Sequence, residues 1–101
     1  MTDDLSDVIL YNKGILRVEC NDCQLNYSVL SKDFNVNIKE GSQDIPFFYI
    51  SDFKLKTQVK SLENQGIRLL IIDSSGRVVS NELSECSEGE VRQGSFQINA
   101  K

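Results

Sequence analysis

The chain contains no histidine and no tryptophan, and it contains a single proline. Without histidine the sequence lacks the commonest general base of enzymes and the Ser–His and Cys–His pairs that activate nucleophiles. Carboxylates gather between residues 82 and 90, but a glycosidase needs two of them across a cleft, and a chain of 101 residues rarely builds both a cleft and a core. We expect a protein that is not an enzyme and that holds no cofactor and no metal.

Long apolar runs and basic patches are also missing. The longest strong apolar run, Ile67–Ile72, contains Arg68 and is far shorter than the ~18 residues that span a membrane. The net charge is −4, and Lys54, Lys56 and Lys60 form the only local basic cluster. A nucleic-acid-binding protein normally concentrates basic residues on one face, so we expect no nucleic-acid partner.

Three cysteines, Cys20, Cys23 and Cys86, leave at least one thiol unpaired within the chain. The C-x-x-C spacing of the first two does not predict zinc, which takes four ligands, or a thioredoxin-like pair, which needs a helix N-terminus. In an oxidising compartment a disulfide could join Cys20 to Cys23, or either of them to Cys86. In a reducing compartment all three would be small buried side chains.

Apolar and polar residues alternate along most of the chain, which is typical of strands with one buried and one solvated face. The alternating stretches are 16–20, 25–29, 34–38, 53–59 and 96–100. Ile67–Ile72 is apolar on both faces and fits a central strand. The loop Asp73–Gly76 and the β-rich residues after it predict a hairpin.

Seven or eight short strands at this spacing predict an all-β fold. We expect an antiparallel β-sandwich, immunoglobulin-like in outline, with about seven strands. It would form one domain over residues 11–101, preceded by a flexible acidic lead-in at residues 1–10. Because a barrel uses the same alternation, the sequence pattern does not distinguish it from a sandwich.

The stretch Pro46–Ile50 is the most distinctive apolar segment. Pro46 suits the first residue of a strand, because proline cannot donate to the ladder. Phe47 and Tyr49 would face one way, and Phe48 the other. Either this is a central strand buried on both sides, which we favour, or one face is exposed and Phe47, Phe48 and Tyr49 form a contact surface for a protein partner. Free edge strands could also form a dimer.

The segment from about Gly14 to Ile98 resembles small extracytoplasmic β-sandwich proteins of the mycobacterial small membrane protein (MmpS) type, and lipid-anchored domains of similar pattern from Bacteroidetes. The resemblance rests on Leu25–Ser28 and on the strand–turn–strand segment Ile71–Val79. It implies an immunoglobulin-like sandwich outside the cytoplasm and brings no catalytic residues. The tryptophan often found mid-chain in such domains is absent, and Pro46–Phe48 is a loose substitute.

Two functions follow as expectations. The first is an extracytoplasmic binding or assembly module, with a protein as the partner and the ligand unidentified. If Met1 replaces a lipid-bearing cysteine, the natural start would read Cys-Thr-Asp-Asp, as in a surface lipoprotein tethered without a membrane-spanning helix. The alternative is a small acidic cytoplasmic inhibitor or immunity-type protein that blocks a basic partner, with Met1 as the native start. Oxidised cysteines favour the first function and free cysteines the second.

Overall fold

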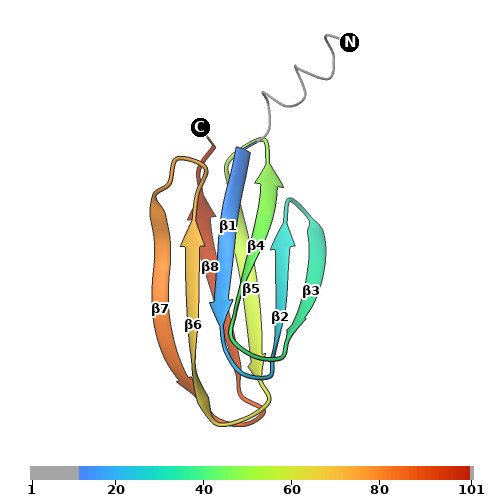
Figure 1. The fold of residues 1–101 in the computed structure, drawn as a ribbon. Coiled ribbons are helices and arrows are strands. Elements are labelled where there is room, and N and C mark those ends of the chain that lie inside the picture. Colours follow the sequence, from blue (N-terminus) through green and yellow to red (C-terminus); the bar gives the residue numbers. More distant parts are fainter. Residues whose placement is uncertain (1–11, 101) are drawn as a thin grey trace.

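The computed structural model describes residues 12–100 and shows an all-β protein (Figure 1). The predicted lead-in at residues 1–10 lies outside the described residues. Eight antiparallel strands follow one another along the chain: β1 (Asn12–Glu19), β2 (Cys23–Val29), β3 (Lys32–Ile38), β4 (Ser42–Tyr49), β5 (Phe53–Ser61), β6 (Gln65–Ile72), β7 (Val78–Cys86) and β8 (Val91–Ile98). Within the described residues no helix is long and apolar enough to cross a membrane.

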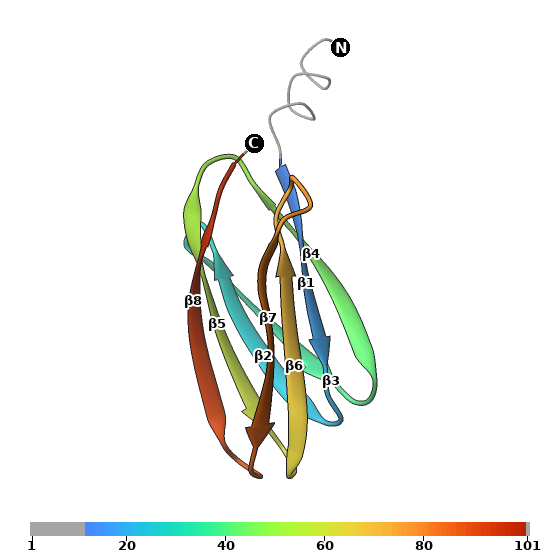
Figure 2. The same ribbon diagram turned by 90° about the vertical axis from the view of Figure 1, so that its left-hand side faces the viewer.

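The strands form two four-stranded sheets, ordered β4-β1-β6-β7 and β3-β2-β5-β8, which face each other as two layers (Figure 2). The β-sandwich prediction is therefore confirmed. The immunoglobulin-like outline is not confirmed, because β1 and β2 lie in opposite sheets, whereas the first two strands of an immunoglobulin constant domain share one. Alternation shows which residues face the core, but it does not specify which strands pair.

The connectivity repeats after four strands with the two sheets exchanged. If each of the strands β1 to β4 is exchanged with the strand four places later in the chain, the order β4-β1-β6-β7 becomes β8-β5-β2-β3, which is the other sheet read in reverse. Edge strand β3 therefore corresponds to edge strand β7, and β4 corresponds to β8. This internal correspondence allows the two open sides of the sandwich to be compared.

The core fills the space between the sheets with the inward side chains of every strand. The largest fully buried side chains are Tyr49, Leu16, Leu25, Leu55, Ile71 and Ile98. Leu16, Leu25, Leu55 and Ile98 come from the alternating stretches read in the sequence. Ile71 belongs to β6, which is a central strand as predicted. The prediction that Pro46–Ile50 is a central strand is wrong, since β4 lies at the edge of its sheet. Pro46 is also not the first strand residue but lies within β4, where an edge position tolerates its missing N–H.

Strand β3 extends beyond the cover of the opposite sheet (Figure 1). Strand β4, at the edge of that sheet, lies over β2 rather than over β3. As a result, the inward side of β3 is poorly covered: Lys32 and Phe34 are exposed, and only Ile38 is buried. The overhang leaves an open space between the edges of β3 and β4.

Candidate functional site: the surface around strand β4

The contact surface predicted at Phe47, Phe48 and Tyr49 divides between the two faces of β4. Phe47 and Tyr49 are buried in the core, whereas 55% of Phe48 is exposed. The alternation predicted for these residues is therefore confirmed, and Phe48 alone of the three offers a large apolar surface to a partner. Ile50, just after the strand, is exposed as well.

A groove of about 450 Å³ runs between the edges of β3 and β4, and we call it the edge groove. Its lining is apolar except for Lys32 and comprises Tyr27, Val29, Leu30, Lys32, Phe34, Pro46, Phe47 and Phe48. The ring of Phe34 stacks on that of Tyr27 at a centroid distance of 5.0 Å. Even so, 42% of Phe34 remains exposed, because no strand of the opposite sheet covers it.

The equivalent side of the sandwich, between β7 and β8, is built differently. The inward residues of β7 that precede Cys86 are the polar Ser80, Glu82 and Ser84, where β3 has apolar side chains. Arg92 of β8 reaches across and donates from Nη2 to the backbone oxygen of Glu85 at 3.0 Å. The opening on this side is therefore smaller, about 250 Å³, and has a mixed polar and apolar lining, whereas the corresponding opening at β3 and β4 is wider and almost entirely apolar.

The apolar surface continues around the edge of β4 onto the outer face of its sheet. Four residues stand in register across that sheet, one per strand: Pro46, Ile15, Ile72 and Val78. We call them the apolar row. Phe48 lies beside this row and also lines the edge groove, so it joins the two apolar surfaces.

Charged pairs border the apolar row. Arg17 holds Asp44 with two hydrogen bonds, from Nε to Oδ1 at 2.6 Å and from Nη2 to Oδ2 at 3.0 Å. This hydrogen-bonded contact lowers the pKa of the Asp44 carboxyl. Arg68 lies 3.6 Å from Glu19 further along the same face. An apolar centre with a charged margin is the usual anatomy of a protein interface.

The cysteines lie away from this surface. Cys20 and Cys23 form a disulfide across the connection that carries the chain from β1 to β2, and Cys86 is a buried free thiol. Gln65 fixes the same connection, because its Oε1 accepts from the backbone N–H of Asn21 at 2.6 Å and its Nε2 donates to the Asn21 oxygen. The Cys20–Cys23 pairing is the one of the predicted alternatives that the structure contains.

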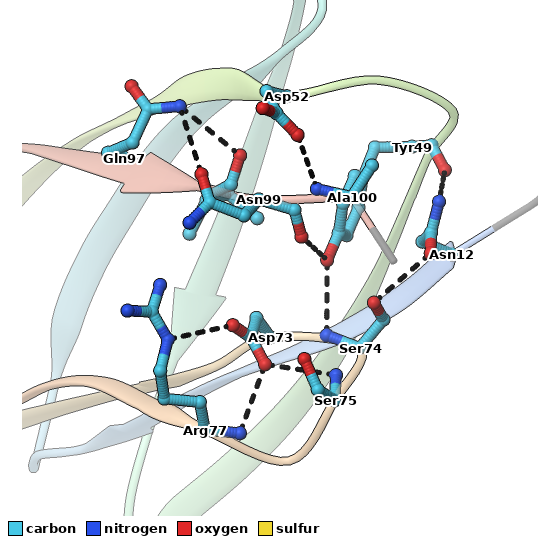
Figure 3. A network of polar contacts seen from close by, with 11 residues as sticks. Asn12, Tyr49, Asp52, Asp73, Ser74, Ser75, Arg77, Gln97, Asn99 and Ala100 are labelled. Atoms are coloured by element: carbon cyan, nitrogen blue, oxygen red, sulfur yellow. Dashed lines mark hydrogen bonds and ion pairs between the residues drawn. The ribbon is translucent and has the colours of Figure 1, made fainter.

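A polar network closes the opposite end of the sandwich (Figure 3). Tyr49 donates its hydroxyl to the backbone oxygen of Asn99 and accepts from the N–H of Ser74, at 3.0 and 3.1 Å. Asp73 accepts from the backbone N–H groups of Ser75 and Arg77 and from the Arg77 side chain. Each of these groups fastens a turn or a terminal strand, so the network has a structural role.

Hydrogen bonds set the pKa values of two acidic groups, Asp73 and Glu90. Burial alone would raise the pKa of Asp73, but its bonds to Arg77 and Ser75 lower the pKa overall. The pKa of Glu90 is lowered mainly by the backbone N–H of Ser87. Within residues 12–100, no group of three or more acidic or cysteine side chains could hold a metal ion. The acidic residues between 82 and 90 are mostly exposed, as expected of a solvated segment.

The sequence alone did not indicate three residues of these apolar surfaces. Two of them, Phe34 and Leu30, line the edge groove, and the third, Ile15, belongs to the apolar row. The alternation of residues 34–38 predicts that Phe34 faces inward, and only the pairing of the sheets shows that this face is uncovered. The comparisons with known proteins add no further assignment, since no protein-family model, curated protein or solved structure matches this chain.

Proposed function

We propose that this protein is a non-enzymatic binding or assembly module of the extracytoplasmic space. In this proposal it holds an extended apolar segment of a partner protein in the edge groove, against strands β3 and β4. The observation that carries the proposal is the asymmetry between the two equivalent open sides of the sandwich. The opening at β3 and β4 is the larger, about 450 Å³ against about 250 Å³, and its lining is apolar except for Lys32, whereas Glu82, Ser84 and Arg92 make the opening at β7 and β8 more polar.

The shape and chemistry of the groove favour an extended peptide. The space lies between two edge strands, and edge strands carry backbone groups that can pair with an added strand. Phe34 and Phe48 offer exposed aromatic surface, the type of side chain that contributes most to protein interfaces. Among the described residues, Lys32 is the only charged group in the lining. We therefore expect an acidic residue near the end of the segment that lies against the β2–β3 turn.

The disulfide supports an extracytoplasmic location. Disulfides persist in oxidising compartments and are rare in the cytosol. The Cys20–Cys23 bond closes a short connection between the two sheets, and thiols held so close together are readily oxidised where the compartment allows it. A lipid tether on a cysteine in place of Met1 remains part of the proposal. A complete gene sequence without a lipid-modification signal upstream would contradict the tether.

The groove is tested with peptides selected from a displayed random library on the full chain. The variants Phe34→Ser and Phe48→Ser should weaken binding of the selected peptides by at least about tenfold each, since each removes a large apolar contact. Leu83→Ser is the matched control, because Leu83 has a similar exposure of 58% but lies on the opposite edge strand β7. Failure to select any peptide, or equal losses in all three variants, would contradict the proposed function.

A second outcome would identify a different occupant. Sedimentation of the protein at increasing concentration measures self-association. A dimer that Phe48→Ser dissociates and Leu83→Ser does not would show that a second copy of the chain occupies this surface. That result would replace the partner segment by an edge-strand dimer.

A further inference from the structure

The outer face of the sheet β3-β2-β5-β8 is chemically unlike the outer face of the other sheet. Four amide side chains stand in register across it, one on each strand, and we call them the amide row: Asn35, Asn26, Gln58 and Gln93. A second polar row lies two residues further along each strand: Asp33, Ser28, Lys56 and Ser95.

A trough of about 760 Å³ lies between these two rows. Its floor is strand backbone, because the residues between the rows point inward: Phe34, Tyr27, Thr57 and Gly94. Four strands set about 4.8 Å apart give a trough roughly 14 Å long, and rows two residues apart set a width of roughly 7 Å. These dimensions suit a single extended chain that crosses the strands.

Strand formation does not explain the amide row. Asparagine is depleted in strands, where β-branched and aromatic side chains are favoured. Yet Asn26 and Asn35 occupy opposed positions at the middle of β2 and β3. Residues disfavoured by the local structure are often retained for a function.

The amides are arranged in two hydrogen-bonded pairs. Asn35 donates from Nδ2 to Oδ1 of Asn26, and Gln93 donates from Nε2 to Oε1 of Gln58 at 3.5 Å. An amide has one acceptor oxygen and two donor hydrogens, so each pair still has donors and acceptors to offer to a ligand. A ligand hydroxyl, which both donates and accepts, matches such a surface.

The charged side chains that line the trough sum to a net charge of zero. Asp33 and Lys56 are its only charged side chains, with one charge of each sign. Ser28 donates its hydroxyl to Asp33 and holds that carboxylate in the second row. The walls therefore favour neither a polyanion nor a polycation.

We propose that this trough binds a neutral, polyhydroxylated chain, in chemical terms a linear uncharged oligosaccharide. The site lies on a different sheet face from the apolar row. It shares Tyr27 and Phe34 with the edge groove, but the amide row and the second polar row are not part of that groove. A protein with both sites would hold a protein segment at the edge of the sandwich and a glycan chain on one face.

The test starts by screening the full chain against an array of neutral and charged oligosaccharides and measuring affinity by calorimetry for those that bind. Asn26→Ala and Gln58→Ala should each weaken binding by at least about tenfold, equivalent to about 1.4 kcal/mol. Asn37→Ala is the matched control, because Asn37 is an amide on the same face of β3 but outside the trough. The amide signals of the variants in an NMR spectrum confirm that each one folds.

Three results would overturn the proposal. The first is that the wild-type protein binds no neutral oligosaccharide on the array, and the second is that it binds charged oligosaccharides alone. The third is that binding survives both trough substitutions. Loss of binding in Asn37→Ala to the same extent as in Asn26→Ala would move the site away from the trough. Because Phe48→Ser leaves the trough intact, that variant should bind the oligosaccharide with unchanged affinity, which keeps the two proposed sites distinguishable.

Discussion

The ring of Phe47 lies directly over Gly14, its partner on the neighbouring strand β1. A Cβ atom on Gly14 would lie only 2.3 Å from Cζ of Phe47, closer than real atoms approach. The glycine therefore makes room for an aromatic ring that is buried in the core and that also borders the edge groove. This pair couples the packing of the core to the position of β4.

Gly14→Ala should lower the free energy of unfolding by about 1–3 kcal/mol, the usual cost of overpacking a core. Denaturant unfolding measures this change. Gly66→Ala is the control, because a Cβ there would meet only the ends of two flexible side chains, Glu85 at 3.3 Å and Leu83 at 3.4 Å. If the two substitutions had equal effects, the close contact between Gly14 and Phe47 would not be the cause.

Tyr49→Phe should lower the free energy of unfolding by about 1–3 kcal/mol, because it leaves the partly buried N–H of Ser74 and the oxygen of Asn99 without this partner. Tyr27→Phe serves as the control, since within residues 12–100 the Tyr27 hydroxyl has no hydrogen-bond partner. Thermal or denaturant unfolding of both variants gives the comparison. A stability for Tyr49→Phe equal to that of Tyr27→Phe would contradict the role given to the network in Figure 3.

The lowered pKa of Asp73 predicts that the folded protein loses stability in acid. Its pKa in the folded protein lies below the ordinary value of 3.8, so the unfolded chain takes up the proton more readily. The stabilisation is complete well above pH 3.8 and is lost as the pH falls below that value through the folded pKa. Melting temperatures measured from pH 2 to pH 7 should show a smaller decrease for Asp73→Asn than for the wild type. Equal decreases would show that other groups cause the acid sensitivity.

One disulfide and one free thiol predict how many alkyl groups the protein takes up before and after reduction. Protein purified without reductant and alkylated under denaturing conditions should carry one alkyl group, on Cys86, and three after reduction. Cys20→Ser with Cys23→Ser should lower the free energy of unfolding by about 2 kcal/mol or less, because the bond closes a very short loop. Three alkylated thiols in protein never exposed to reductant would favour the alternative function, an acidic cytoplasmic inhibitor of a basic protein.

The alternation of apolar and polar residues was enough to predict most of the strands and their inward faces. The inward positions of 16–20, 25–29 and 53–59 follow from period two, and the hairpin after Asp73 follows from its turn residues. Strand order could not be read, because two partners with the same alternation are equally acceptable neighbours. For this reason the sequence pattern favours a central position for Pro46–Ile50, whereas β4 lies at an edge, and the immunoglobulin-like outline is not confirmed.

The site was only partly predictable for the same reason. Phe48 stands out as an aromatic residue in an apolar run, and alternation separates it from Phe47 and Tyr49. Phe34 becomes part of the surface only because β3 lies beyond the cover of the opposite sheet. The amide row also requires the register, since its members lie on four strands and are separated by up to 67 positions, from Asn26 to Gln93 (93 minus 26).

The most direct test of the central claim is an NMR titration of the ¹⁵N-labelled full chain with a peptide selected on it. We predict that the largest shift changes fall on the residues that line the edge groove, above all Phe34 and Phe48, and that amide exchange slows along β3 or β4 as an added strand pairs with its edge. Shift changes concentrated at β7 and β8, or spread evenly over the sandwich, would contradict the assignment of the edge groove as the binding surface.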